Sequence, residues 1–84
     1  MTEVYKSEYQ TLTFDMELSR FEQTWLNTTS LDEEVLKEEL LTFARMVEEY
    51  QPVIVISDKT NFKYDMKPEF KKWLMKNVPM EKIS

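Results

Sequence analysis

The segment VIVI, residues 53–56, constrains the fold of this chain more than any other feature. Four apolar residues without alternation are typical of a short strand that is buried on both faces. The chain before them, up to Tyr50, repeats apolar residues at the spacing of an amphipathic helix. This stripe consists of Val35, Leu36, Leu40, Phe43, Ala44 and Val47. A strand, a long helix and a second buried strand predict a βαβ crossover, which is right-handed by strong preference.

The first part of the chain has the pattern of antiparallel strands. Residues 4–9 are predicted to form a first strand. Residues 11–17 alternate between polar and apolar side chains, with Met16 as the last apolar one, which is typical of a strand with one face in water. After a turn at residues 18–20, the alternation continues on a returning strand over residues 21–26. Together these segments predict a meander.

Two helices are expected to pack on the sheet. The first spans residues 30–50, and Ser30 and Glu33 have the spacing of a capping box at its start. The second spans residues 68–78, with Pro68 at the first helical position, where a missing N–H is tolerated. Four acidic residues of the first helix are expected to face solvent: Glu38, Glu39, Glu48 and Glu49.

The expected fold class is a small α/β (α+β) domain. Its mixed sheet combines an N-terminal antiparallel meander with one βαβ crossover, and both helices pack on that sheet. The 84 residues fit a single domain, 1–84, in which residues 80–84 form a tail.

Several chemistries are excluded by residue types that the chain lacks. It contains no cysteine, no histidine and no glycine. The absence of cysteine rules out disulfides and thiolate nucleophiles, and the absence of histidine removes the commonest general base and metal ligand. Without glycine the chain has no P-loop and no dinucleotide-binding turn. We therefore expect no metal site and no cofactor.

Charge is divided unevenly along the chain. Residues 1–50 carry twelve acidic and four basic side chains, whereas residues 51–84 carry four acidic and seven basic ones. Solvated faces account for this division, and the alternative is a Lys-rich end that binds phosphate or an acidic partner. The net charge of −5 argues against general nucleic-acid binding. No signal-like start and no long apolar run occurs, so we expect a cytoplasmic protein without membrane insertion.

The order of elements and several motifs resemble a known family. Antiparallel strands end at Trp25, an acidic helix reaches Tyr50, and the sequences PVIVISD and KPEFKKWL follow. In these features the chain is similar to the SpoIIAA-like members of the STAS domain superfamily, especially small uncharacterised bacterial ones. The resemblance covers most of the chain and implies a module that binds partner proteins or, in some members, small ligands.

The resemblance also implies two departures from the family. The switch serine of its best-known members would lie near residues 66–68, yet no serine or threonine occurs between Asn61 and Ile83. A phosphoserine switch is therefore missing. Family members continue with further strand and helix units, so this chain is expected to be a truncated or minimal version, or to have its sheet completed by another chain.

Candidate binding residues follow the VIVI strand. The carboxyl ends of strands in α/β sheets are favoured by ligands. The residues at this end are Ser57, Asp58, Thr60 and Asn61. The alternative is that they only form the turn. A second set is predicted to contact a protein partner: Trp73, Lys67 and Lys71. Trp25 is expected to belong to the core.

Three hypotheses about function follow from the sequence. A hydrophobic strand close to a sheet edge needs cover, which favours a non-catalytic interaction or regulatory module that forms a homodimer or binds a protein partner. The alternative is a domain that binds a small ligand or lipid in a pocket near the end of strand 53–57. The third hypothesis is an enzyme with Asp58 or Asp65 as base and Lys59 or Lys63 as electrophile. It requires a carboxylate with a raised pKa in a cleft, and we expect no enzyme.

Overall fold

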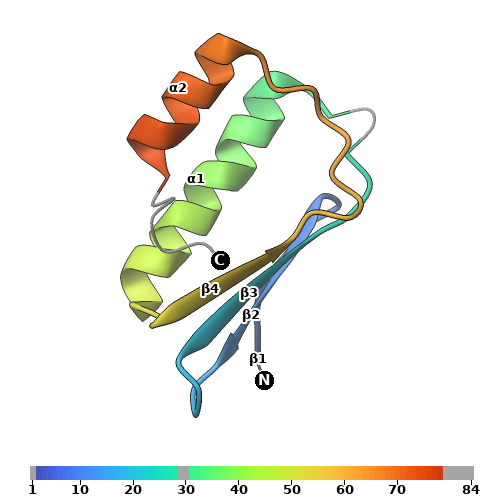
Figure 1. Ribbon diagram of the computed structural model, residues 1–84. Coiled ribbons are helices and arrows are strands. Elements are labelled where there is room, and N and C mark those ends of the chain that lie inside the picture. Colours follow the sequence, from blue (N-terminus) through green and yellow to red (C-terminus); the bar gives the residue numbers. More distant parts are fainter. Residues whose placement is uncertain (1, 29–30, 79–84) are drawn as a thin grey trace.

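The described part of the chain forms four strands and two helices (Figure 1). The computed structural model describes residues 2–28 and 31–78. The elements are β1 (Thr2–Lys6), β2 (Gln10–Asp15), β3 (Arg20–Trp25), α1 (Glu33–Tyr50), β4 (Ile54–Asp58) and α2 (Pro68–Asn77). The strands form one sheet in the order β1-β2-β3-β4. Strands β1, β2 and β3 are antiparallel, and β4 is parallel to β3, so the predicted mixed sheet is confirmed.

Helix α1 connects the parallel strands β3 and β4, and it lies with α2 on the same side of the sheet (Figure 1). The core forms between the helices and this face of the sheet. Its buried apolar residues are Leu12, Phe21, Trp25, Leu31, Leu36, Leu40, Phe43, Val47, Val55, Phe70, Leu74 and Val78. The expected core position of Trp25 is confirmed, because its side chain is 3% exposed.

The N-terminal strands differ from the prediction at their ends. Strand β1 stops at Lys6 instead of residue 9, because the Ser7 hydroxyl accepts hydrogen bonds from the backbone N–H groups of Tyr9 and Gln10 and turns the chain. Strand β2 stops at Asp15. Met16 therefore lies in the β2–β3 turn, and its side chain is 81% exposed.

Strand β4 is not buried on both faces, and that prediction was wrong. Val55 is completely buried, whereas Ile54 is 42% exposed and Ile56 is 38% exposed. The physical reason is that, among the described residues, β4 lies at one end of the sheet and both helices cover the same face of it. Side chains alternate between the faces of a strand, so only every second residue reaches the core.

The helix ends agree with the prediction to within a few residues. Helix α1 begins at Glu33 rather than residue 30, and its N-cap Asp32 makes no side-chain capping bond. The predicted capping residue Ser30 lies outside the described residues, as does the predicted tail at residues 80–84. Helix α2 has Pro68 in its first turn, as expected, and ends at Asn77. Neither helix in the described part of the chain is long and apolar enough to cross a membrane.

Candidate functional site

The four predicted ligand-binding residues lie in different surroundings. Asp58, Thr60 and Asn61 are exposed. The Asp58 carboxylate accepts a hydrogen bond from the backbone N–H of Thr60 at 3.0 Å, which is the turn geometry given above as the alternative. Ser57 alone is partly buried, and its hydroxyl donates to Gln23 Oε1 at 2.7 Å.

The electrostatics of Asp58 run against the role of a general base. Hydrogen bonds from the side chain and the backbone of Thr60 lower the pKa of the Asp58 carboxyl. These bonds stabilise the charged form of the carboxylate. A base that works near neutral pH needs the opposite shift, because a raised pKa improves proton abstraction.

Glu39 is buried, contrary to the expectation that it faces solvent. It lies at the margin of the apolar stripe of α1, three residues after Leu36 and four before Phe43, and it is 8% exposed. Its carboxylate accepts three hydrogen bonds. Tyr5 OH donates to Oε2 at 2.8 Å, whereas the Ser7 hydroxyl and Gln10 Nε2 donate to Oε1 at 2.6 and 3.1 Å.

Two glutamines extend these contacts across the sheet. Gln10 Nε2 also donates to the Glu39 carbonyl oxygen at 2.8 Å, and Gln23 Nε2 donates to Gln10 Oε1 at 2.8 Å. Ser57 completes the series through its bond to Gln23. We call these residues the polar chain: Tyr5, Ser7, Glu39, Gln10, Gln23 and Ser57. It runs from α1 and β1 over β2 and β3 to β4, beneath the helices.

From Ser57 to Glu39, the hydrogen bonds of the polar chain all run in one direction from donor to acceptor. An ionised carboxylate only accepts hydrogen bonds, so the amide NH₂ of Gln10 must point to Glu39. The Gln10 oxygen then accepts from Gln23, and the Gln23 oxygen accepts from Ser57. The Ser57 hydroxyl therefore donates a hydrogen bond to the Gln23 oxygen, and its own oxygen lone pairs stay available as acceptors.

Sequence reasoning missed the polar chain, although a signal for part of it was present. Gln23 stands between Phe21 and Trp25 on the alternation of β3, so its side chain faces the helices. The spacing of Glu39 from Leu36 and Phe43 is likewise that of an inward position.

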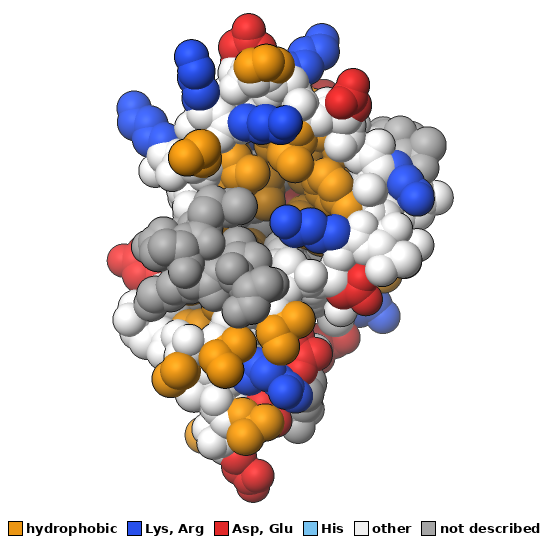
Figure 2. Space-filling view, viewed as in Figure 1, with side chains coloured by type: hydrophobic (Ala, Val, Ile, Leu, Met, Phe, Trp, Pro, Cys, Tyr) orange, Lys and Arg blue, Asp and Glu red, His pale blue; other side chains and the backbone are white. Residues whose placement is uncertain are grey.

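A small cavity lies at the Ser57 end of the polar chain, and its volume is about 50 Å³. Gln23, Trp25 and Ser57 form its wall on the sheet side. Leu40 and Phe43 come from α1, Leu74 comes from α2, and Phe62 and Met66 come from the connection between β4 and α2. Figure 2 shows a hollow bordered by hydrophobic side chains, with basic side chains close by. The cavity is therefore apolar except at the Gln23–Ser57 side and at Lys59.

A second surface feature lies at the start of β4. Hydrophobic side chains gather there over β4 and the β2–β3 turn (Figure 2). We call this surface the edge patch: Met16, Leu18, Val53, Ile54 and Ile56, all at least 38% exposed. In the described part of the chain, β4 pairs only with β3. Its outer edge therefore presents backbone N–H and C=O groups together with apolar side chains.

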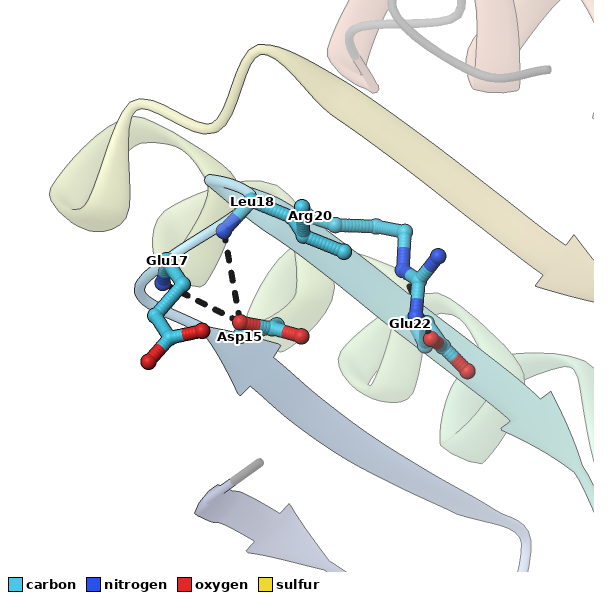
Figure 3. A network of polar contacts seen from close by, with 5 residues as sticks. All are labelled: Asp15, Glu17, Leu18, Arg20 and Glu22. Carbon is cyan, nitrogen blue, oxygen red and sulfur yellow. Dashed lines mark hydrogen bonds and ion pairs between the residues drawn. The ribbon is translucent and has the colours of Figure 1, made fainter.

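The β2–β3 turn is held in place beside β4. Asp15 Oδ1 accepts hydrogen bonds from the backbone N–H groups of Glu17 and Leu18 at 3.1 and 3.3 Å (Figure 3). The carbonyl oxygen of Ser19 accepts from the N–H of Val53 at 2.8 Å. These bonds bring the exposed side chain of Leu18 close to the start of β4.

The two β3 charges beside β4 form an ion pair with each other. On β3, Arg20 stands beside Ile54 and Glu22 stands beside Ile56. Arg20 Nε lies 2.9 Å from Glu22 Oε2 (Figure 3). The strand next to β4 therefore adds no net charge to this surface.

The predicted partner-binding residues lie on and before α2, away from β4. Lys67 and Lys71 are exposed. Trp73 is partly buried, with its ring 5.6 Å from that of Phe70, and Lys37 Nζ of α1 lies 5.4 Å from the Trp73 ring centre. Trp73 thus packs between the two helices.

No group of three or more carboxylates that could hold a metal ion occurs in residues 2–28 and 31–78. Comparisons with protein-family models, with curated proteins and with solved structures found no match.

Proposed function

We propose that this protein is a non-catalytic interaction module that forms a symmetric homodimer through the outer edge of β4. The observation that carries the proposal is the edge patch. Val53 is 77% exposed, and Ile54 and Ile56 add apolar area beside an edge that pairs with no other described strand. Natural proteins ordinarily cover such an edge, because it pairs readily with other strands.

A second copy of the chain suits this edge for two reasons. Two β4 strands related by a two-fold axis would pair antiparallel. This pairing would place side chains of the partner's β4 beside Ile54 and Ile56. The Arg20–Glu22 pair keeps the surface beside β4 close to neutral, although the whole chain carries −5. The β3 charges beside β4 therefore add no net repulsion between two copies.

The family relationship belongs to the same proposal. The STAS-like character and a regulatory role in the cytoplasm of a bacterium are supported by the order of elements and the motifs around PVIVISD. The missing switch serine favours a dimer or a constant partner contact over control by phosphorylation.

Light scattering coupled to size-exclusion chromatography tests the proposal. The wild-type protein is expected to elute with twice the chain mass of 10.2 kDa over a wide concentration range. The Ile54→Lys and Ile56→Lys variants are expected to weaken the dimer by at least about thirtyfold, because charges would enter the centre of the interface.

The matched control is Thr24→Lys, which adds the same charge on the exposed side of β3, one strand from the edge. It is expected to leave the dimer mass unchanged. A monomeric wild-type protein contradicts the proposal, and so does a dimer that Trp73→Ala dissociates while Ile56→Lys does not.

A further inference from the structure

The cavity lies where ligands of α/β sheets are usually bound. It adjoins the carboxyl ends of the parallel strands β3 and β4, because Trp25 is the last residue of β3 and Ser57 the penultimate residue of β4. The edge patch begins at the opposite end of β4, at Val53. What the cavity binds is therefore a separate question from dimer formation.

The size of the cavity limits its occupant. A cavity needs about 10–15 Å³ to hold one water molecule. The cavity volume of about 50 Å³ therefore holds only a few non-hydrogen atoms. Phe43, Phe62 and Leu74 are among the side chains that line it. A short aliphatic chain fits both the volume and the lining, whereas an aromatic or sugar ring is too large.

The Ser57 end of the polar chain selects the polar group of the occupant. Gln23 is 3% exposed, and its oxygen needs the proton that Ser57 donates. If Ser57 turned to donate to a ligand, that buried oxygen would lose its partner, which is unfavourable. Ser57 is therefore an acceptor at the cavity, and it matches a ligand that carries a hydroxyl donor.

The third feature of the cavity is the positive charge of Lys59. Lys59 lines the cavity two residues after Ser57, and its side chain is exposed. An ammonium group at this place favours an anionic group that stays in contact with solvent. The cavity thus combines an apolar interior, an acceptor on its wall and a positive charge where it meets the surface.

From these three features we infer that the cavity binds a short-chain hydroxy acid. The aliphatic part lies against Phe43, Phe62 and Leu74, the ligand hydroxyl donates to Ser57 Oγ, and the carboxylate lies outside near Lys59. This arrangement leaves the bond from Ser57 to Gln23 intact.

Nuclear magnetic resonance tests this inference with 3-hydroxybutyrate as the probe and butyrate as its match without the hydroxyl. The Trp25 indole N–H reports the cavity, and the Trp73 indole N–H serves as an internal reference outside it. We expect saturable shifts of the Trp25 signal with 3-hydroxybutyrate in the millimolar range. Butyrate is expected to bind about fivefold more weakly, which is the usual factor for one neutral hydrogen bond.

Variants separate the two polar contacts. Ser57→Ala is expected to abolish the preference for 3-hydroxybutyrate over butyrate, and Ser57→Thr, which keeps a hydroxyl, is expected to retain it. Lys59→Gln is expected to weaken both acids equally and to leave the weaker binding of n-butanol unchanged. Lys72→Gln, which removes an exposed positive charge on α2 outside the cavity lining, is the matched control and should alter nothing.

Three outcomes would overturn the inference. They are equal affinity of the wild-type protein for the two acids, a preference that survives Ser57→Ala in a folded variant, and shifts confined to the surface lysines of α2. Because the experiment reads the Trp25 signal, it gives the same answer for a monomer and for a dimer. The binding experiment would therefore remain interpretable if the protein proved to be a monomer.

Discussion

Glu39 carries a carboxylate into the interior of a small protein. Burial of a charge is unfavourable unless hydrogen bonds compensate for the lost water. Three donors, on Tyr5, Ser7 and Gln10, supply this compensation. The carboxylate in turn orients both glutamines of the polar chain, so one residue of α1 fixes the hydrogen-bond direction as far as β4.

Replacement of Glu39 by glutamine is predicted to destabilise the fold. An amide NH₂ cannot accept a hydrogen bond, so at least one of the three donors loses its partner. The free energy of unfolding should fall by about 2 kcal/mol, as for the loss of a hydrogen bond to a buried charge. Urea denaturation measures the change. Glu38→Gln, at the exposed neighbouring position, is the control and should change stability by less than about 0.5 kcal/mol. Equal effects of the two substitutions would show that the Glu39 bonds contribute nothing.

Tyr5 is predicted to make the free energy of unfolding fall at alkaline pH. Burial and the hydrogen bond to Glu39 raise the pKa of the Tyr5 phenol. Because the folded-state pKa lies above the usual value of about 10, the stabilisation is complete below that pH and is lost as pH rises through the folded-state pKa.

The Tyr5→Phe variant tests this dependence. Near neutral pH it should be less stable than the wild-type protein by about 1 kcal/mol, because one partly exposed hydrogen bond is lost. The difference should shrink above pH of about 10, where a tyrosinate would stand beside the Glu39 carboxylate. Denaturation at a series of pH values measures it. A constant difference from neutral to alkaline pH would rule out this linkage.

At the scale of elements, the C-terminus of α1 contains a conformation that glycine would adopt more easily. Gln51, the C-cap, has φ 48° and ψ 53°, in the left-handed region, and its N–H donates to the Val47 carbonyl at 2.9 Å. The chain has no glycine to place there. The helix therefore ends in the usual left-handed way with a residue that adopts this conformation less readily.

Gln51→Gly is predicted to stabilise the protein by about 0.5 kcal/mol. The free energy gained by relief of backbone strain should exceed the entropic cost of the greater freedom that glycine has in the unfolded chain. Glu49→Gly, at an exposed position inside the same last turn, should destabilise it by about 1 kcal/mol. Thermal denaturation of the two variants provides the comparison. Destabilisation by both would mean that the side-chain bond from Gln51 Nε2 to the Glu48 carbonyl outweighs the strain.

Periodicity predicted the elements well but could not predict the surroundings of β4. The 3.6-residue stripe located α1, and the alternation of polar and apolar residues located β2 and β3. The run of apolar residues at 53–56 indicated burial on both faces, yet Ile54 and Ile56 are partly exposed. The order of elements placed this strand close to a sheet edge, but the apolar run alone could not show that only one of its faces is covered by helices.

The candidate site was predictable only in part, because its polar residues come from distant segments. The strand end at Ser57 was expected from the general preference of ligands, and the cavity lies there. The link from Ser57 to Gln23 and onward to Glu39 joins residues far apart in the chain. Only the pairing of β2 with β3 and of β3 with β4 brings these polar side chains into one row.

At the scale of the whole molecule, the edge patch and the cavity lie toward opposite ends of β4. The edge patch lies at its start, beside the β2–β3 turn, and the cavity lies at its end, beneath the helices. In an antiparallel dimer through β4, the two sheets would join into one of eight strands, with the helices of both copies on the same face. The cavities would then stay separate from the interface, on its helix-covered side.

Nuclear Overhauser contacts between copies test the dimer most directly. The sample mixes carbon-13-labelled and unlabelled protein, so that only contacts between different chains are detected. A dimer through β4 should give contacts from the Ile54 and Ile56 methyl groups to β4 protons of the other copy. Contacts that instead join Trp73 and the α2 surface of two copies, or the absence of any contact between copies at millimolar concentration, would contradict it.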